Sequence, residues 1–282
     1  MNEVVRSIEE ASSLDSPSDA IAASASKLLP PGPVKDALSG RWLGHPLHPL
    51  LTDIPIGFWS GSLLLDLVGG KQRRKAADTL LGMGILAALP TAVSGLSDWV
   101  DTFGDERRVG FVHALANSVA LTLYTASYLA RKNGRRGRGV LLSLGGAAAM
   151  SAGGYLGGHL SYRLGVGVNH TRFGHPAEDW TAVMPAADLA ERTPSLVETG
   201  DVKVLVYKNG PQMCAIADNC SHRGGPLHEG EVDHASRIVT CPWHASQFSL
   251  VTGEIVRGPA TAPQPAYDVR ITGDNVEVRP RH

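Results

Sequence analysis

Cysteine is scarce in this chain of 282 residues, which contains only three. Cys220 and Cys241 each stand shortly before a histidine, so Cys214 is left alone and a structural disulfide within the chain is excluded. An excess of positive charge is also missing, because 26 basic residues stand against 27 acidic ones. This balance excludes a general basic surface for nucleic acid, and we expect no nucleic-acid partner.

The N-terminal residues 1–40 lack both a basic region followed by an apolar core and a twin arginine, so we expect no cleavable export signal. Acidic residues alternate there with Ala and Ser, and a proline-rich stretch at 30–33 breaks any helix. We predict a tail or amphipathic helix over 1–40.

Charge is absent from most of the central part of the chain. Four apolar segments each approach the roughly 20 residues needed to cross a bilayer core, and they cover 51–69, 79–97, 110–130 and 139–162. The last three contain no Asp, Glu, Lys or Arg, whereas every helix of a soluble bundle carries a charged face. We therefore predict an all-α, four-helix transmembrane bundle over 41–165, with the lipid bilayer as its surroundings.

The loops between these segments predict an orientation. Residues 71–75 and 131–138 are strongly basic, whereas 98–108 carries four acids and two arginines. By the positive-inside rule both basic loops are cytoplasmic. The N-terminus, the middle loop and the C-terminal domain are then expected on the extracytoplasmic side of a bacterial cell membrane.

Histidines and acids gather at one end of the predicted bundle. Because consecutive helices run in opposite directions, the starts of the first and third segments lie at the same end as the ends of the second and fourth. The side chains expected at this end are His45, His48, Asp53, Asp98, His113 and His159. Ionisable groups inside lipid are costly and usually functional or paired. This layer could hold haem b, a quinone or a transition metal, or could form ordinary interhelical hydrogen bonds.

Cysteine and histidine form two closely spaced pairs in the last part of the chain. Cys220 and His222 are in the spacing C-x-H, and Cys241 and His244 are in the spacing C-x-x-H. Four such ligands could bind zinc or a mixed-ligand iron–sulfur cluster. Each pair lies in a Gly/Pro-rich loop and not on the helix that a zinc finger needs, which favours the cluster.

The surrounding residues 181–282 alternate apolar and polar side chains in short runs separated by turns. We predict strands at 202–207, 213–217, 236–240, 247–250, 267–271 and 275–278, hence a small all-β domain. Residues 166–180 are polar and Gly-rich, and are predicted to be a linker whose His170 and His175 are solvated.

This C-terminal stretch resembles the Rieske [2Fe–2S] family at the two ligand pairs and downstream, through Phe248, residues 252–254 and the proline-rich 258–265. The resemblance implies that Cys220 and Cys241 bind one iron and that His222 and His244 bind the other. It also implies that Ser246 donates a hydrogen bond to a bridging sulfide.

The sequence departs from the high-potential members of that family. They carry a disulfide between the two loops and a tyrosine that reaches a cysteine sulfur, whereas the corresponding positions here are Gly225, Trp243 and Phe248. Hydrogen bonds to sulfur favour the reduced cluster, so their loss lowers the potential. We expect a potential in the lower half of the range of about −150 to +300 mV, as in the ferredoxins that serve oxygenases. Trp243 and Phe248 are expected to shield the cluster.

The membrane half resembles a family of uncharacterised bacterial four-helix membrane domains with the same His-Pro-Leu-His-Pro stretch at 45–49, a family that supplies no activity. Together the two halves predict a membrane-bound Rieske electron-transfer protein, a carrier component and not a complete enzyme. It would pass single electrons between a partner protein or quinone and a second redox site at the histidine layer. The alternatives are a quinol or small-molecule oxidoreductase with its active site in the membrane domain, a redox sensor, and a zinc-binding structural head.

Overall fold

The computed structural model describes residues 2–281, which divide into two compact units. The first contains the chain up to Leu29 and Leu47–Val166, and the second contains Pro30–Pro46 and the chain from Gly167 onwards. Residues 30–46 thus belong with the C-terminal domain, whereas the sequence suggested a boundary near residue 40. The physical reason lies in contacts of a short helix in this segment, described below.

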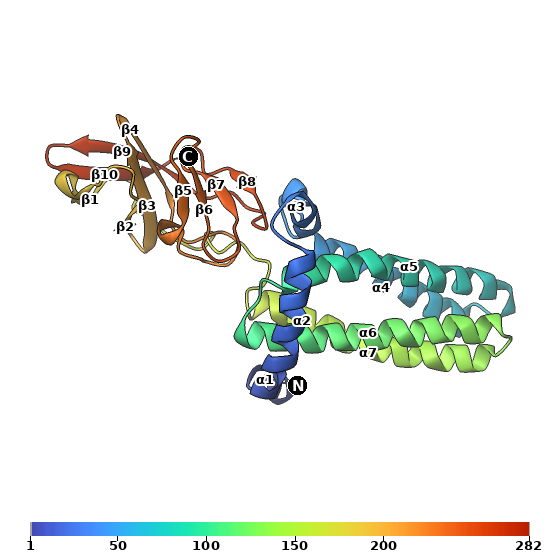
Figure 1. The fold of residues 1–282 in the computed structure, drawn as a ribbon. Helices are drawn as coiled ribbons and strands as arrows, with labels where there is room; N and C mark the ends of the chain where they lie inside the picture. Colours follow the sequence, from blue (N-terminus) through green and yellow to red (C-terminus); the bar gives the residue numbers. More distant parts are fainter. Residues whose placement is uncertain (1, 282) are drawn as a thin grey trace. The chain divides into compact units, whose positions relative to one another are not determined.

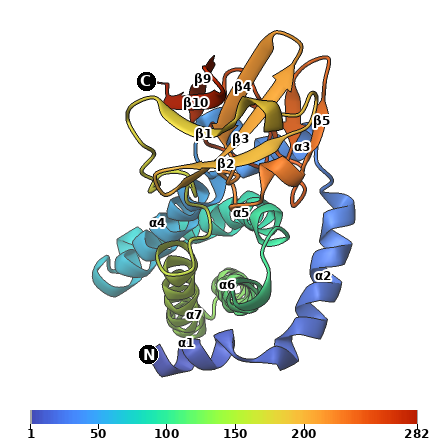
Figure 2. The ribbon, with the colours of Figure 1, turned by 90° about the vertical axis from the view of Figure 1, so that its left-hand side faces the viewer.

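The first unit is helical. It has two short helices, α1 (Asn2–Glu9) and α2 (Asp15–Leu28), and four long ones, α4 (Leu47–Val68), α5 (Arg74–Trp99), α6 (Gly104–Lys132) and α7 (Arg136–Tyr162). Helices α4 and α5 pack as one hairpin and α6 and α7 as another, while α1 and α2 lie across one end (Figures 1 and 2). Single 3-10 turns at Ser12–Leu14 and Lys71–Arg73 precede α2 and α5.

The four long helices are long and apolar enough to cross a membrane, as predicted. Only 17–28% of each apolar window is buried inside the protein, so most of the apolar surface faces outward. Many of the buried positions are small or weakly polar, as in helices that pack within lipid, beside a cluster of larger side chains that includes Trp59, Leu81 and Tyr124. For example, Gly84 lies against the ring of Trp59, and Ser62 donates a 2.8 Å hydrogen bond to the carbonyl of Ala77.

One charged residue from each long helix meets in a buried cluster. Arg131 lies 2.6 Å from Asp66 and 3.2 Å from Asp78, and Arg136 lies 2.5 Å and 3.0 Å from the same two acids. The side chains of Arg131 and Asp66 are fully buried. The two positive and two negative charges balance, which makes the cluster compatible with an apolar interior.

Ion pairs fasten α1 and α2 to the end of the bundle. Arg108 of α6 forms a bidentate salt bridge with Asp15, at 2.6 and 2.8 Å, and also donates a hydrogen bond to the carbonyl of Glu9. Arg107 pairs with Asp19 at 2.7 Å. The N-terminal residues therefore belong to the helical unit as ordered helices.

The second unit consists mainly of two antiparallel sheets. The larger has the order β1-β10-β9-β4-β3-β2 and the smaller the order β5-β6-β7-β8. The strands are β1 (Thr181–Pro185), β2 (Ser195–Thr199), β3 (Val202–Asn209), β4 (Gln212–Ala217), β5 (Glu231–Asp233), β6 (Ile238–Thr240), β7 (Gln247–Ser249), β8 (Ile255–Arg257), β9 (Ala266–Thr272) and β10 (Asn275–Pro280). The all-β prediction is confirmed, and all six predicted strands are present; β1, β2, β5 and β8 are additional.

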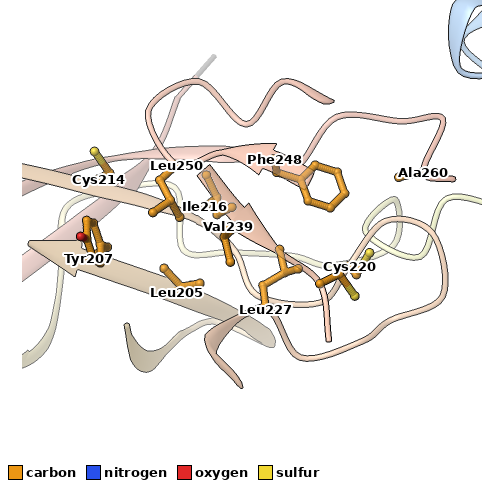
Figure 3. Packing of buried hydrophobic residues seen from close by; sticks show 11 residues of the cluster. Leu205, Tyr207, Cys214, Ile216, Cys220, Leu227, Val239, Phe248, Leu250 and Ala260 are labelled. Atoms are coloured by element: carbon orange, nitrogen blue, oxygen red, sulfur yellow. The ribbon is translucent and has the colours of Figure 1, made fainter. Parts of the chain in front are cut away.

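A core of apolar side chains joins the two sheets of this domain (Figure 3). Leu205 and Ile216 come from the larger sheet, and Val239 and Phe248 from the smaller one. Cys220 belongs to the same core, so the cysteine loops begin directly from packed strands. Short 3-10 turns at Ala186–Asp188 and Leu227–Glu229 complete the domain.

Helix α3 (Pro33–Ser39), followed by a 3-10 turn at Arg41–Leu43, packs in this second unit. The N–H of Gly258 donates a 2.9 Å hydrogen bond to the Asp36 carboxylate, and Arg41 donates to the carbonyl of Ile255 at 3.3 Å. These polar contacts hold residues 30–46 against the end of β8.

Candidate functional site

The two predicted ligand pairs lie in two loops with the same backbone design, one between β4 and β5 and the other between β6 and β7. In the first loop the N–H of Cys220 donates to the carbonyl of Gly225 at 2.9 Å, and the N–H of Gly224 donates to Cys220 at 2.7 Å. In the second, Cys241 and Ser246 form the equivalent bond at 2.8 Å, and the N–H of Ala245 donates to Cys241 at 3.1 Å.

The equivalence of the loops extends to backbone conformation. The fifth residue of each loop is left-handed, with φ of 73° at Gly224 and 59° at Ala245. This conformation turns each chain sharply, so the amide groups that follow the cysteine point back toward its sulfur. The sulfur of Cys220 accepts from the N–H groups of His222 and Arg223.

The second sulfur is held in the same way. Cys241 accepts from the N–H groups of Trp243 and His244. The two thiols also share a hydrogen bond, which raises the pKa of Cys220 well above its ordinary value and lowers the pKa of Cys241 to about 7. Burial reinforces the first shift and opposes the second. Of the two thiols, Cys241 is therefore the one closer to its thiolate, which is the form that binds a metal.

The two histidines lie beside one another. The rings of His222 and His244 are 5.0 Å apart between centroids and nearly perpendicular, at 89°. Each ring has a buried nitrogen, Nδ1 of His222 and Nε2 of His244. Burial of the His222 ring penalises the imidazolium and, with smaller repulsion from His244 and Lys35, lowers its pKa well below the ordinary value. A neutral imidazole is the form that binds metal.

The arrangement discriminates between the two metal centres that the sequence left open. A tetrahedral zinc site brings four donors to one point, yet among residues 2–281 no three His, Cys, Asp or Glu side chains converge on a single ion. A binuclear cluster instead needs two sulfurs on one side and two imidazoles on the other. The four residues fit that donor set.

The space between the loops is restricted by Gly225. A Cβ at this position would lie 2.9 Å from the sulfur of Cys241 and 3.1 Å from the Trp243 ring, too close for any other residue without a shift. A glycine here allows the loop to approach the sulfur.

Neighbouring polar groups brace the loops. Ser246 is fully buried, and its Oγ accepts a 3.0 Å hydrogen bond from the N–H of Ala260, so its own O–H can be donated elsewhere. Gln264 accepts from the N–H of Ser221 and donates to the carbonyls of Ala217 and Asn219. The sequence did not predict the role of Gln264, since an amide in a proline-rich run gives no signal of what it contacts.

The aromatic residues expected to shield the site behave differently. Phe248 is fully buried in the core, whereas Trp243 is 52% exposed. Two further histidines of this domain have structural partners, because His228 contacts Asp218 and His234 contacts the hydroxyl of Tyr207.

Of the predicted membrane histidines, the structure brings two together. The rings of His48 in α4 and His113 in α6 are 6.2 Å apart between centroids. His159 contacts Glu9 of α1 at 2.7 Å instead, and His45 is exposed and belongs to the second unit. Asp53 is exposed and Asp98 partly buried.

The sequence did not predict the buried cluster of Asp66, Asp78, Arg131 and Arg136. Asp66 lies inside the first apolar segment, and the two arginines lie in the basic loop at 131–138, so neither position indicates its partner. Their partners are 53 to 70 residues away along the chain, so only the folded bundle shows the pairing.

Comparison with known proteins gives two family matches. Residues 179–268 match the family described as "Rieske [2Fe-2S] domain", and residues 44–170 match "Predicted membrane protein (DUF2231)". Both resemblances seen in the sequence are thereby confirmed. A membrane domain is supported by this second match and by the four long apolar helices.

Individual relatives are similar to the C-terminal domain. The 3-phenylpropionate/cinnamic acid dioxygenase ferredoxin subunits of Shigella boydii serotype 4 (strain Sb227) and Escherichia coli (strain K12) are 34% identical over 92 residues, covering 33% of this chain and 85% of each relative. Among solved structures, the ferredoxin of carbazole 1,9a-dioxygenase from Nocardioides aromaticivorans IC177 is 28% identical, with a TM-score of 0.35, covering 37% of this chain and 100% of that one.

Proposed function

This chain belongs to the Rieske [2Fe–2S] family through its C-terminal domain, and from that premise we propose that it is a membrane-anchored carrier of single electrons. Cys220 and Cys241 would hold one iron of the cluster, and His222 and His244 the other. The observation that carries this assignment is the pair of equivalent loops, which present two adjacent sulfurs and two adjacent imidazoles.

When bound, the cluster takes up and releases one electron. The protein supplies the surroundings that set how readily this happens. Four backbone N–H groups directed at the two cysteine sulfurs stabilise negative charge there and favour the reduced state. The Ser246 hydroxyl is placed to donate a further bond. Because the two loops share no disulfide and position 248 is phenylalanine instead of tyrosine, we propose a potential in the lower half of the range of about −150 to +300 mV.

We propose a redox protein as the partner of the cluster domain. The relatives are named as ferredoxin subunits of dioxygenases, which act with other proteins of the same systems. By that likeness the partner would be a reductase or an oxygenase component that docks at the loops. A quinone is the alternative partner.

The membrane unit would contribute the second redox site. Support comes from His48 and His113, which lie together inside the bundle although 65 residues separate them in sequence. Haem b and quinone are the two candidates for this site. The unit would also anchor the cluster domain at the extracytoplasmic face, on the strength of the basic loops at 71–75 and 131–138.

The first test is the content of the purified full-length chain in mild detergent. We expect iron and acid-labile sulfide in equal amounts and an electron paramagnetic resonance signal of the Rieske type after reduction. Cys220→Ser and His244→Ala should abolish that signal, while Cys214→Ser, which changes a buried cysteine outside the loops, should keep it. Zinc in place of iron would overturn the proposal.

A topology test addresses the proposed side of the membrane. Ser236→Cys in the β domain and Gln72→Cys in the basic loop each introduce an exposed thiol. In intact cells a membrane-impermeant thiol reagent should label the first and spare the second. The opposite pattern would place the cluster domain in the cytoplasm.

A further inference from the structure

The His48 and His113 side chains are each fixed by a backbone carbonyl of the neighbouring helix in the same hairpin. Nδ1 of His48 contacts the Thr91 carbonyl of α5 at 3.0 Å, and Nδ1 of His113 contacts the Gly153 carbonyl of α7 at 2.8 Å. Because a carbonyl oxygen only accepts, each Nδ1 must carry a proton. In a neutral ring Nε2 then holds the lone pair, which is the metal-binding form.

The separation of the two rings suits one metal between them. A metal bonded to one nitrogen of each ring at about 2.0–2.1 Å, on opposite sides, would place the ring centroids about 6 Å apart. The observed distance between centroids is 6.2 Å, and the ring planes are 81° apart. A flat quinone ring stacked between the two imidazoles would require a larger separation.

The donor set of the protein identifies the kind of metal centre. Among residues 2–281 no third His, Cys, Asp or Glu converges with this pair, whereas a metal ion held by protein alone takes at least three such ligands. Two opposed histidines suffice only where another molecule supplies the remaining ligands. A haem does so, because its macrocycle gives four nitrogens and leaves two axial positions.

Small residues surround the pair. A Cβ on Gly95 would lie 2.6 Å from Cε1 of His48, and a Cβ on Gly157 would lie 3.1 Å from Cε1 of His113, so both rings lie against glycine backbone. His48 and His113 belong to different hairpins, α4–α5 and α6–α7, which form separate pairs in both views (Figures 1 and 2).

One polar neighbour contacts the proposed ligand atom. The Asn117 amide nitrogen lies 3.2 Å from Nε2 and 3.4 Å from Nδ1 of His113, so it lies beside the ring and is not directed at one nitrogen. The same amide donates to the His113 carbonyl at 2.9 Å, so it keeps a partner when Nε2 binds a metal.

From this geometry we propose that His48 and His113 are the axial ligands of a b-type haem held between the two helix hairpins. The inference rests on the proposed electron-carrier function and names the second redox centre. One electron from the reduced cluster would convert ferric haem iron to ferrous, with no proton or leaving group involved.

The test uses full-length protein expressed with added iron and haem precursor and purified in mild detergent. We expect one haem b per chain by the pyridine haemochrome assay and a sharp α band in the reduced-minus-oxidised spectrum. The oxidised protein should show the strongly anisotropic low-spin resonance typical of perpendicular axial imidazoles. A chain that contains the cluster but no haem would overturn this inference and leave the electron-carrier proposal standing; loss of the cluster itself would overturn the latter.

Variants assign the ligands. His48→Ala and His113→Ala should each lose haem and retain the cluster signal, which also reports that the chain has folded. His159→Ala and His45→Ala are the matched controls, and both should retain haem. Because an alanine could disturb packing, His113→Met supplies a second measurement: a methionine ligand should keep haem but raise its potential and alter its spectrum. Haem that is unchanged in His48→Ala and His113→Met would overturn the assignment.

Discussion

The carboxylate of Asp36 accepts a hydrogen bond of 2.9 Å from the N–H of Gly258, a residue 222 positions later in the chain. Asp36 lies in α3, before the first membrane helix, while Gly258 opens the proline-rich segment that braces both cysteine loops. The same carboxylate pairs with Arg41 at 3.1 Å. A segment outside the matched residues 179–268 is thus part of the cluster domain.

Asp36→Ala should destabilise the cluster domain. A hydrogen bond to a charged group contributes about 1.5–3 kcal/mol, and its loss leaves the buried Gly258 N–H without this acceptor. We expect bleaching of the cluster absorbance at lower temperature or denaturant concentration. Asp188→Ala, which removes an exposed acid from the same domain, is the control and should have almost no effect. Equal behaviour of the two variants would show that α3 does not brace the loops.

Lys35→Met should lower the reduction potential of the cluster. Lys35 is 4% exposed in α3, and its charge is one of the causes, after burial and His244, that lower the pKa of His222. A nearby positive charge favours the reduced, more negative cluster by an amount on the order of 1 kcal/mol, or tens of mV, when partly screened. Protein-film voltammetry would measure the shift. Lys203→Met, at an exposed site in the same domain, should leave the potential unchanged, and an upward shift for Lys35→Met would contradict the prediction.

Gly225→Ala should prevent assembly of the cluster. Its added Cβ would lie 2.9 Å from the Cys241 sulfur, against a loop that cannot move without displacing that sulfur. Gly224→Ala is the matched neighbour: a Cβ there meets only His170 Nδ1, at 4.0 Å, although φ is +73°. The left-handed conformation costs about 1–2 kcal/mol, yet Ala245 already tolerates the equivalent position. Iron content and the resonance signal should therefore be lost in the first variant and kept in the second.

Asp66→Ala should strongly destabilise the helical unit. It leaves Arg131 and Arg136 in the bundle with only Asp78 to balance them, and removing one partner of a buried ion pair typically costs about 3–5 kcal/mol. Thermal unfolding in detergent, followed by circular dichroism at helical wavelengths, would measure the loss. Asp53→Ala, which changes an exposed acid in the same helix, is the control. Its thermal unfolding transition should match that of the unmodified protein. A normal transition for Asp66→Ala would mean that the cluster does not hold the helices together.

Features that depend on one short stretch of chain were predictable from the sequence in both halves of the molecule. The apolar segments were recognisable because a bilayer-spanning helix needs about 20 consecutive apolar residues, a property of one stretch of chain. The spacings between Cys220 and His222, and between Cys241 and His244, were equally local, because each ligand pair comes from a single tight loop. The alternation of Val202–Asn209 predicted a strand for the same reason.

Contacts between distant segments were decided only by the tertiary structure. The sequence placed four histidines and two acids at one end of the bundle, but helix rotation and the position of α1 left only His48 facing His113, with His159 paired to Glu9. The sequence pattern does not predict which histidines face each other, because that depends on how the two helix hairpins pack.

The same limit applies to α3 and to the buried charges. A seven-residue helix between prolines and a glycine carries no local signal of its partner, and an arginine in a basic loop looks solvated until a carboxylate from another helix lies 2.6 Å away. The sequence by itself determined the two domain types, the cluster and its four candidate ligands. The tertiary structure decided which ionisable groups meet, since that outcome is a property of packing and not of any one segment.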